Sequence, residues 1–405
     1  MILQGRNIVL GVTGGIAAYK AVDLCSKLVQ AGATVDVIMT EAATRFVTPL
    51  PFQTISARPV SVDMFQLLRD TEMAHISLSA KADVLVIAPA TANTIAKLAY
   101  GLADNLLTST VLATTAPLVI APAMDADMWA NPLTQENVRL LRERGAAIVG
   151  PGHGRLASGR MGAGRLVSTE EIMAAIRQTL GRNGALARLR VTVTAGGTQE
   201  PIDPVRYVSN RSSGKMGYAL AEVARDEGAQ VTLVSAPTGL NPVYGAEMVA
   251  VRTAAEMHEA VMGRLEQTDV LIMAAAVADY RPAQVAAQKI KKGTGGLTLE
   301  LERTQDILTA VAQARVMGMP GLVVGFAAET EDLLANAQDK LQRKKLDLIV
   351  ANDVSANDSG FGVDTNRVTL IAANGQVEAL PLMSKFEVAE HVLGRAAALW
   401  RASHG

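Results

Sequence analysis

Short, continuous apolar runs alternate with longer stretches of helical spacing along most of this chain. In the first half the runs span residues 7–12, 34–39, 83–88 and 118–121, and a helical pattern follows each of them. A continuous apolar run is typical of a parallel strand that is buried on both faces. Strands that alternate with helices predict a right-handed, doubly wound α/β sheet.

The same pattern begins again in the second half. Between the halves, residues 180–190 contain two glycines and an asparagine and break the periodicity. We therefore expect two domains, 1–182 and 189–405, each a three-layer, doubly wound, mostly parallel sheet, flavodoxin- or Rossmann-like in the first and Rossmann-like in the second. The strands expected in the second domain span residues 190–195, 230–235, 269–275, 322–327 and 347–351, with 367–372 as an antiparallel edge.

Composition excludes several classes of protein. Lys and Arg number 38 and Asp and Glu number 39, so the chain has no electrostatic footprint for nucleic acid. No apolar run approaches the ~20 residues that a membrane helix needs, and the first residues lead straight into a strand without a signal sequence. Cys25 is the single cysteine, which excludes an internal disulfide and a cysteine-based zinc site. These features predict a cytoplasmic enzyme of small-molecule metabolism, with no nucleic-acid or membrane partner.

A glycine turn at Thr13, Gly14 and Gly15 joins the first strand to the first helix. Glycines let the backbone approach a phosphate closely, and the helix N-terminus offers free N–H groups to it. The G-x-G-x-x-G sequence of dinucleotide sites is absent, which disfavours a dinucleotide-dependent reductase. Thr40 ends the second strand with a hydroxyl, which suits the phosphate of a mononucleotide.

Further polar motifs follow the other strands of the first half. Residues 88–94 (APATANT) and 122–129 (PAMDADMW) each end a strand, and residues 104–110 begin a hydroxyl-rich helix. Together with GGIAAYK at residues 14–20, these motifs resemble the flavin-dependent cysteine decarboxylases. The resemblance covers the whole first domain and implies an FMN site formed by Thr13, Gly14, Gly15, Thr40, Ala90, Thr91 and Ser109.

His75 is the catalytic base that the resemblance implies, because it matches the family's position ahead of the strand at residues 83–88. A base that deprotonates the substrate thiol makes oxidation of that thiol by the flavin easier. Met124 and Asp125 are the implied substrate contacts. Asp125 stands where the commonest family motif has asparagine. Because an ionised aspartate would repel a substrate carboxylate, Asp125 must either be protonated or not touch that carboxylate.

Ser158 is a second departure from the family pattern. Many relatives carry a cysteine there, which donates a proton in the reductive half of the reaction, and a serine hydroxyl is a far weaker acid. Cys25 does not replace that thiol, because it lies in a predicted helix beside Leu24 and Leu28 and is expected to be buried. We interpret the chain as an active branch of the family with altered protonation. Two alternatives stay open: a reaction that stops at the oxidised ene-thiol, and an FMN-binding regulatory module without catalysis.

The longest polar motif of the second half follows its first strand, at residues 195–217. It ends in SSGKMG, where two hydroxyls, a lysine and the N–H groups of a helix start would form an anion-binding cradle. The P-loop sequence G-x-x-x-x-G-K-[ST] is absent. Residues 274–280 and 325–330 follow other strands, and the lysines of residues 289–293 beside Asp279 suit a triphosphate and magnesium.

Together with residues 351–355, these motifs resemble phosphopantothenate–cysteine ligases, and the two halves together are similar to the bifunctional enzymes of bacterial coenzyme A biosynthesis. The resemblance implies that CTP, a cosubstrate, activates 4′-phosphopantothenate as an acyl cytidylate. Cysteine then displaces CMP, and the flavin domain decarboxylates the product to 4′-phosphopantetheine. The resemblance also implies a homo-oligomer, with trimeric flavin domains and dimeric ligase domains.

The resemblance further assigns roles to single residues of the second domain. Asn210 and Lys289 are the implied catalytic residues, Arg206 and Ala275 bind substrate, and Asp279 binds Mg²⁺. Lys340 and Lys344 are expected on one face of a helix. The implied CTP site comprises Ser212, Gly214, Lys215, Met273, Ala274, Ala275, Asp279, Lys289, Gln305, Asp306, Ile307, Leu308, Phe326, Lys340 and Lys344.

Overall fold

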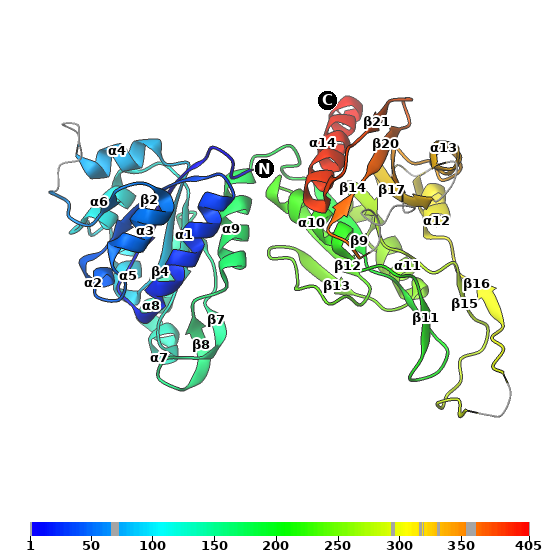
Figure 1. Ribbon diagram of the computed structural model, residues 1–405, viewed down its shortest axis with the longest axis horizontal. Coiled ribbons are helices and arrows are strands. Elements are labelled where there is room, and N and C mark those ends of the chain that lie inside the picture. The colour runs from blue at the N-terminus through cyan, green and yellow to red at the C-terminus, as the bar shows by residue number, and fades with distance from the viewer. Residues whose placement is uncertain are drawn as a thin grey trace. The chain divides into compact units, whose positions relative to one another are not determined.

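The chain forms two compact units in the computed structural model, an N-terminal unit (Met1–Gly181) and a C-terminal unit (Arg182–Gly405). The structure describes residues 2–65, 73–292, 296–315, 318, 320–329, 333–353 and 362–404. Four residues of the predicted motifs, at positions 293, 330, 354 and 355, lie outside these ranges. Each unit is a sheet with helices on both faces, which confirms the predicted α/β fold class (Figure 1). Within the described ranges, no helix combines the length and the apolar character needed to cross a membrane.

The N-terminal unit is built on a six-stranded parallel sheet in the order β3-β2-β1-β4-β5-β6. The order reverses between β1 and β4, and ligands of such sheets bind beside this point at the carboxyl ends of the strands. A separate antiparallel hairpin of β7 (Gly152–Arg155) and β8 (Met161–Arg165) follows the sheet. The sheet strands are β1 (Asn7–Val12), β2 (Thr34–Met39), β3 (Val60–Ser61), β4 (Val84–Ala90), β5 (Leu118–Pro122) and β6 (Ala147–Ile148).

Helices cover both faces of this sheet. One face carries α1 (Lys20–Gln30), α3 (Pro49–Ser56) and α9 (Thr169–Gly181), and the other carries α4 (Ala74–Lys81), α5 (Ala92–Tyr100), α6 (Leu106–Ala113) and α8 (Pro132–Glu143). The short helices α2 (Glu41–Thr44) and α7 (Ala126–Ala130) begin soon after β2 and β5. The helical pattern that follows the apolar run at residues 7–12 is divided into a 3₁₀ turn, η1 (Ile16–Tyr19), and α1. The turn arises because the Ala18 N–H bonds the Gly15 carbonyl three residues back, at 2.9 Å.

The C-terminal unit has an eight-stranded sheet in the order β13-β12-β9-β14-β17-β18-β20-β21. Its first six strands are parallel and, counted along the chain, are arranged as in the N-terminal unit. Residues 367–372 form an antiparallel strand as predicted, but β21 covers it, so it is not the edge. The strands are β9 (Arg190–Ala195), β12 (Gln230–Ser235), β13 (Glu247–Ala250), β14 (Val270–Met273), β17 (Leu322–Glu329), β18 (Leu348–Asp353), β20 (Val368–Ala372) and β21 (Val377–Ala379).

Two hydrophobic layers cover this second sheet. Helices α10 (Lys215–Asp226) and α14 (Lys385–His404) pack on one face, against side chains such as Val191 and Val193 of β9. Helices α11 (Ala254–Met262), α12 (Ile307–Ala314) and α13 (Leu333–Arg343) pack on the other face. Two antiparallel pairs extend away from the sheet (Figure 1), β10 (Gln199–Pro201) with β11 (Tyr207–Ser209), and β15 (Tyr280–Pro282) with β16 (Leu301–Arg303). We call these two hairpins together, residues 199–209, 280–292 and 296–303, the arm. The remaining elements are η2 (Leu265–Gln267), β19 (Thr365–Asn366) and β22 (Met383–Ser384).

Several predicted element ends are wrong by one or two residues, since the strands expected to end at residues 88, 327 and 351 each end two residues later. Two further differences have a visible cause. The strand predicted over residues 269–275 ends at Met273, because the Ala275 N–H donates to Thr194 Oγ1 at 3.1 Å instead of continuing the ladder with β17. Lys344 lies one residue beyond α13 and so does not share that helix with Lys340, although its N–H still donates to the Lys340 carbonyl at 3.0 Å.

Candidate functional site

The residues predicted to hold a flavin gather at the carboxyl edge of the N-terminal sheet. Thr13 follows β1, Thr40 follows β2, and Thr91 follows β4, of which Ala90 is the buried last residue. Ser109 lies on α6, where its hydroxyl is 3.3 Å from the Ala103 carbonyl. The structure therefore brings the predicted residues together at the reversal point between β1 and β4, the ordinary ligand position in such a sheet.

Hydroxyl groups hold the turns of this edge in place. Thr13 Oγ1 donates to the Pro89 carbonyl at 2.7 Å and accepts the Thr91 N–H at 3.1 Å, so it joins the end of β1 to the end of β4. Thr40 and Thr91 each accept an N–H from the first turn of the helix that follows. Because the Thr13 hydroxyl is buried in this clamp, a bound phosphate would meet the backbone N–H groups of the turn rather than this side chain.

The two glycines of the first turn have different reasons to be there. A Cβ on Gly14 would lie 2.4 Å from the Ala42 Cβ, so the close approach of the turn to α2 requires glycine. A Cβ on Gly15 would make only an ordinary van der Waals contact, with Thr91 Cγ2 at 3.7 Å, so the turn is not crowded at this residue. An open cradle at the start of a helix fits the phosphate of a mononucleotide.

His75 lies in the first turn of α4, and its Nδ1 atom is buried without a hydrogen-bond partner among the described residues. Buried polar atoms are nearly always hydrogen-bonded, so an unpartnered one indicates a partner that the described residues do not supply. This orphaned nitrogen fits a site that a cofactor or substrate completes.

The β7–β8 hairpin and its turn, residues 152–165, form a flap beside α7 (Figure 1). The Met124 N–H donates to the Gly164 carbonyl at 2.9 Å, and a Cβ on Gly164 would lie 2.2 Å from the Met124 carbonyl oxygen. A Cβ on Gly162 would lie 2.8 Å from the Ala126 Cβ. The flap backbone is therefore seated directly on the segment that carries Met124 and Asp125.

Asp125 and Ser158 are in direct contact. The Ser158 hydroxyl donates to Asp125 Oδ2 at 2.7 Å, and the Arg160 guanidinium binds Oδ1 of the same carboxylate. The other guanidinium nitrogen donates to Asp127 at 2.7 Å. The Ser158 hydrogen bond holds the pKa of Asp125 below its usual value, helped by the Asp127 N–H and by the charge of Arg160. In this arrangement Asp125 is an ionised carboxylate.

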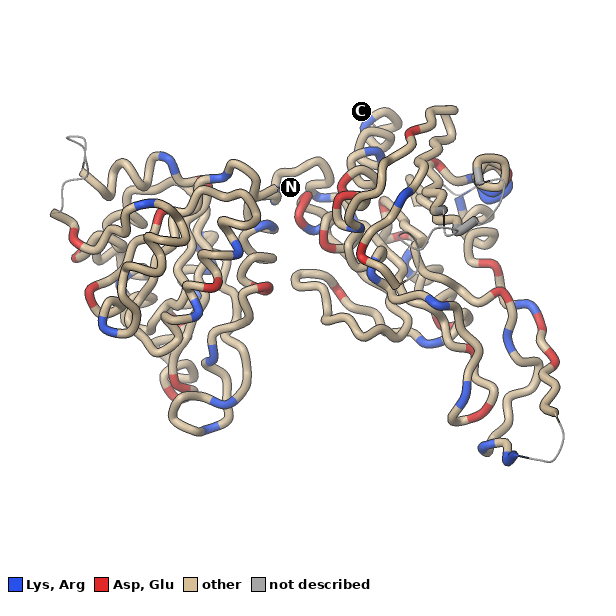
Figure 2. Tube along the Cα trace, in the orientation of Figure 1, with Lys and Arg blue, Asp and Glu red and all other residues tan. Residues whose placement is uncertain are grey.

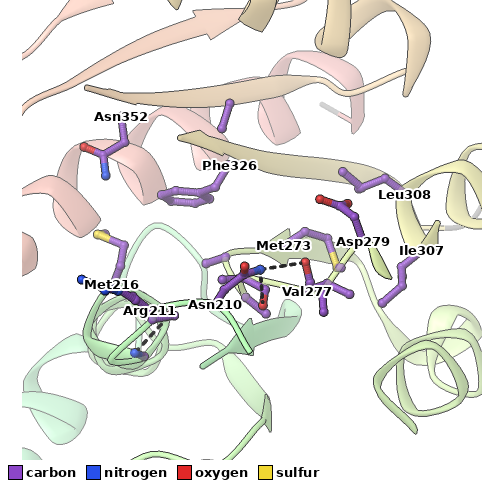
Figure 3. A pocket seen from close by; sticks show the side chains of 18 of the residues that line it. Asn210, Arg211, Met216, Met273, Val277, Asp279, Ile307, Leu308, Phe326 and Asn352 are labelled. Atoms are coloured by element: carbon purple, nitrogen blue, oxygen red, sulfur yellow. Dashed lines mark hydrogen bonds between the residues drawn. The ribbon is translucent and has the colours of Figure 1, made fainter. Parts of the chain in front are cut away.

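In the C-terminal unit, a cavity of about 1090 Å³ opens at the carboxyl ends of β9, β14 and β17. Its wall contains Asn210 and every residue predicted for the CTP site except Lys289. The side chain of Phe326 reaches from β17 toward the loop that carries Asn210 (Figure 3). The structure thus assembles side chains from five separate stretches of sequence around one cavity.

Two threonine hydroxyls shape the loop between β14 and the arm. Thr198 Oγ1 accepts the Ala278 N–H at 2.9 Å, and Thr304 Oγ1 donates to the Ala278 carbonyl at 2.6 Å. Asn210 Nδ2 lies 3.3 and 3.1 Å from the carbonyls of residues 276 and 277 (Figure 3). These bonds position Asp279, which follows directly, at the cavity wall.

Lysines at the cavity are paired with protein oxygens. Lys215 Nζ binds Asp364 Oδ1 at 2.6 Å, Lys340 Nζ donates to the Phe326 carbonyl at 2.9 Å, and Lys344 Nζ binds the Asp306 carboxylate. The Lys344 ion pair and the Thr309 N–H lower the pKa of Asp306 despite the opposing effect of burial. Sequence reasoning did not assign several further residues of the wall, among them Arg211, Asn352, Asn366 and Lys385.

Lys385 had no signal in the sequence, because a lysine at a helix start is ordinarily a surface residue. Its side chain is only 7% exposed, and its Nζ donates to the Val363 carbonyl. Burial and the nearby charge of Lys215 lower its pKa. The cavity therefore has a buried lysine in addition to the partly exposed Lys215 that was predicted.

Arg206 and Lys289 are the predicted residues that the structure does not bring to the cavity wall. They lie on the arm, where Arg206 donates to the buried Asp203 carboxylate and to the Ile290 carbonyl at 3.1 Å. The Ile290 N–H also donates to Asp203, at 3.1 Å. Asp203 thus joins the two halves of the arm next to Lys289.

No cluster of three or more His, Cys, Asp or Glu side chains suited to a metal ion occurs in the described part of the chain. Lys and Arg are interspersed with Asp and Glu along the trace in Figure 2, as the near-zero net charge leads one to expect.

Two family models match the chain. Residues 2–181 match a family described as "Flavoprotein", and residues 186–399 match one described as "DNA/pantothenate metabolism flavoprotein C-terminal domain". A Bacillus subtilis relative, "Coenzyme A biosynthesis bifunctional protein CoaBC", is 48% identical over 98% of each chain. A Vibrio cholerae relative with the same name is 46% identical, over 96% of this chain and 98% of its own. A Mycobacterium tuberculosis relative, also of that name, is 46% identical, over 96% of this chain and 95% of its own.

Solved structures match each unit separately. The C-terminal domain of a coenzyme A biosynthesis bifunctional protein is 43% identical, covers 54% of this chain and 99% of its own, and has a TM-score of 0.47. A cysteine-to-serine mutant of a PPC decarboxylase, complexed with pantothenoylaminoethenethiol, is 34% identical, covers 43% and 97%, and has a TM-score of 0.39.

Proposed function

The chain belongs to the family of bifunctional coenzyme A biosynthesis proteins, and on that premise we propose that it catalyses two steps of this pathway. The C-terminal unit joins cysteine to 4′-phosphopantothenate through an acyl cytidylate made from CTP. The N-terminal unit decarboxylates the resulting 4′-phosphopantothenoylcysteine to 4′-phosphopantetheine with FMN. A cytoplasmic location is part of the proposal.

The observation that carries the ligase proposal is the cavity of about 1090 Å³. Its size suits a nucleotide together with a second substrate. Lys215 and the N-terminus of α10 would hold phosphate oxygens, and the Phe326 ring offers a face on which a base can stack. Asn210, next to residues 276 and 277, would contact the acyl group of the intermediate.

Magnesium is part of this proposal through Asp279. Mg²⁺ commonly binds one or two carboxylates together with substrate phosphates and waters. A single aspartate at the cavity wall is therefore a sufficient protein contribution when a triphosphate supplies the other oxygens.

The residues at the edge of the N-terminal sheet fit FMN. The turn at Gly14 and Gly15 would hold its phosphate, with Thr40, Ala90, Thr91 and Ser109 around it. Bound FMN would accept a hydride from the substrate and return it after decarboxylation. His75, with its orphaned Nδ1 in the same unit, would take the thiol proton.

A homo-oligomer is also proposed. Large apolar side chains are exposed near the flavin edge, among them Ile16, Tyr19 and Ile76, each at least 50% exposed. The arm exposes Val205, Tyr207, Tyr280, Val285 and Leu297. Exposed apolar patches of this kind mark contact surfaces. They support trimeric flavin units and dimeric ligase units, in which the arm with Arg206 and Lys289 would meet a second copy.

The test is one assay with 4′-phosphopantothenate, cysteine, CTP and Mg²⁺, in which every product is identified by mass. We expect pyrophosphate, CMP, carbon dioxide and 4′-phosphopantetheine, and a yellow protein after purification. Absence of pyrophosphate with every nucleoside triphosphate would refute the ligase proposal. Release of the ene-thiol alone would favour the oxidative-only alternative, which the Ser158–Asp125 hydrogen bond makes worth testing.

A further inference from the structure

The two positions at which the N-terminal unit departs from the decarboxylase pattern touch each other, although they are 33 residues apart in sequence. The amide and thiol of the usual pattern are replaced by a carboxylate and a hydroxyl, and the Arg160 guanidinium binds that carboxylate. Ser158, Arg160 and Asp125 are joined by direct hydrogen bonds. We therefore treat these three side chains together and call them the Asp125 cluster.

The Asp125 cluster, with the protonation described above, presents two chemical difficulties for the decarboxylation. The Ser158 proton is directed at Asp125 and is not available to a substrate. An ionised Asp125 repels a substrate carboxylate where an asparagine would donate to it. One added proton removes both difficulties, because a protonated aspartate has the shape and donor capacity of asparagine and no longer requires the serine proton.

We propose that Arg160 exchanges partners when substrate binds: it leaves Asp125 for the substrate carboxylate, and Asp125 takes up one proton from solvent. Arg160 is thus a positioning residue, and the inference rests on the proposed decarboxylase function. A guanidinium suits this exchange because it binds any carboxylate in the same bidentate manner.

The geometry allows the side chain of Arg160 to move while its backbone stays fixed. The side chain is 54% exposed at the turn of the flap. The flap backbone is held by the Met124–Gly164 hydrogen bond and by the close approach of Gly162 to Ala126. Only the guanidinium therefore needs to be displaced, over the reach of one side chain.

The charged groups around Asp125 favour the same outcome. Asp127 of α7 and Arg160 of the flap are the charged side chains bound in this cluster. Arg165 lies farther along β8, and its charge is felt by Lys20 at the start of α1. Burial, together with the charge of Arg165, lowers the pKa of Lys20. Once Arg160 moves to the substrate, Asp125 faces a second carboxylate, and two carboxylates at one site cannot both stay ionised.

The proton would then be used after carbon dioxide has left. Cleavage of the carbon–carboxylate bond leaves its electron pair in the ene-thiolate. Ser158 Oγ gives its proton to the ene-thiolate carbon next to nitrogen and takes the Asp125 proton in the same step, so that the product is a thioaldehyde and Asp125 is a carboxylate again. Arg160, whose partner has departed as carbon dioxide, returns to Asp125.

The experiment measures proton uptake on binding, with the FMN-loaded full chain and 4′-phosphopantothenoylserine, in which a hydroxyl replaces the reactive thiol. Calorimetric titrations at pH 7.5 in buffers of different ionisation enthalpy give the number of protons taken up per site. We expect about one for the native protein and about none for D125N. D127N, which removes the neighbouring carboxylate on the same guanidinium, should still take up about one, and R160Q should bind the analogue roughly tenfold more weakly.

A second measurement tests the use of the proton. On turnover, D125N and S158A should release a larger fraction of ene-thiol than the native protein. The D125N/S158C protein, which restores the usual asparagine and cysteine, should complete the reaction and should show no proton uptake when it binds the analogue. Zero uptake by the native protein, or undiminished uptake by D125N, overturns the inference while leaving the decarboxylase function intact. Failure of the native protein to bind the analogue at all would instead refute that function.

Discussion

Thr198→Val removes one hydroxyl from beneath the nucleotide cavity without changing the shape of the side chain. Thr198 is fully buried, and its Oγ1 accepts the N–H of Ala278, which is only 4% exposed. Valine leaves this N–H without a partner and out of reach of water. A buried donor left unsatisfied costs about 1–3 kcal/mol, so the C-terminal unit should lose that much of its free energy of unfolding. Its melting temperature should fall by roughly 2–4 °C for each kcal/mol.

The same substitution should weaken nucleotide binding. Ala278 directly precedes Asp279, so release of its N–H loosens the loop that presents Asp279 to the cavity. Thr198→Ser keeps the acceptor and should retain the native affinity for CTP, although the lost methyl group also lowers stability. Thr232→Val is the matched control, since its hydroxyl bonds Glu247 at the surface and its loss should change stability by less than about 0.5 kcal/mol.

The assay can be made specific to one unit. The chain has two tryptophans, Trp129 in the N-terminal unit and Trp400 in the C-terminal unit. In a Trp129→Phe background, fluorescence during urea unfolding reports the C-terminal unit through Trp400, which stacks on His404 with ring centroids 3.8 Å apart. CTP affinity is measured separately by calorimetry. If Thr198→Val and Thr232→Val unfold at the same urea concentration, the role given to this hydrogen bond is wrong.

Three further predictions follow from single contacts. Asp364→Asn should tighten CTP binding by roughly two- to fivefold, because the phosphates of CTP no longer compete with Asp364 for Lys215. Calorimetry measures this affinity. Asp339→Asn is the control, since its partner Arg343 lies on the surface, and it should leave the CTP affinity unchanged. Arg206 and three backbone N–H groups hold the pKa of Asp203 well below its usual range, so its contribution to stability is complete above pH ~4 and is lost as the pH falls. Urea midpoints measured from pH 5 to pH 2 should therefore fall less steeply in Asp203→Asn, and identical slopes would contradict this. Burial raises the pKa of the Cys25 thiol to about 11, so a thiol reagent at pH 8 should modify no cysteine in the folded protein and one after unfolding; rapid reaction of the folded protein would show that Cys25 is accessible.

Some of the site could be predicted because its residues are adjacent in sequence to features with strong local patterns. The run at residues 190–195 and the loop after it predict a strand that ends in an anion-binding turn, and β9 has those bounds. In the same way, the polar residues after β1, β2 and β4 lie at one edge because all three strands are parallel and buried. Periodicity carries this information, since a buried parallel strand has to be apolar throughout.

Contacts between distant residues had no such pattern. The sequence marked Asp125 and Ser158 as separate departures from the family motif, and only the fold shows that they share a hydrogen bond. Lys385 looks like an ordinary helix-start lysine until the sheet places it beside Lys215 in the cavity wall. Hydrophobic spacing determines which segments become strands and helices, but it does not record which polar side chains will meet. That depends on the order of the strands and on the close approach of the flap to α7, where a Cβ on Gly164 would collide with the backbone. The sequence by itself therefore determined the two α/β sheets and the turns that end their strands, whereas the partners of each charged group were decided by the tertiary structure, because electrostatic pairing depends on distance in space and not on distance along the chain.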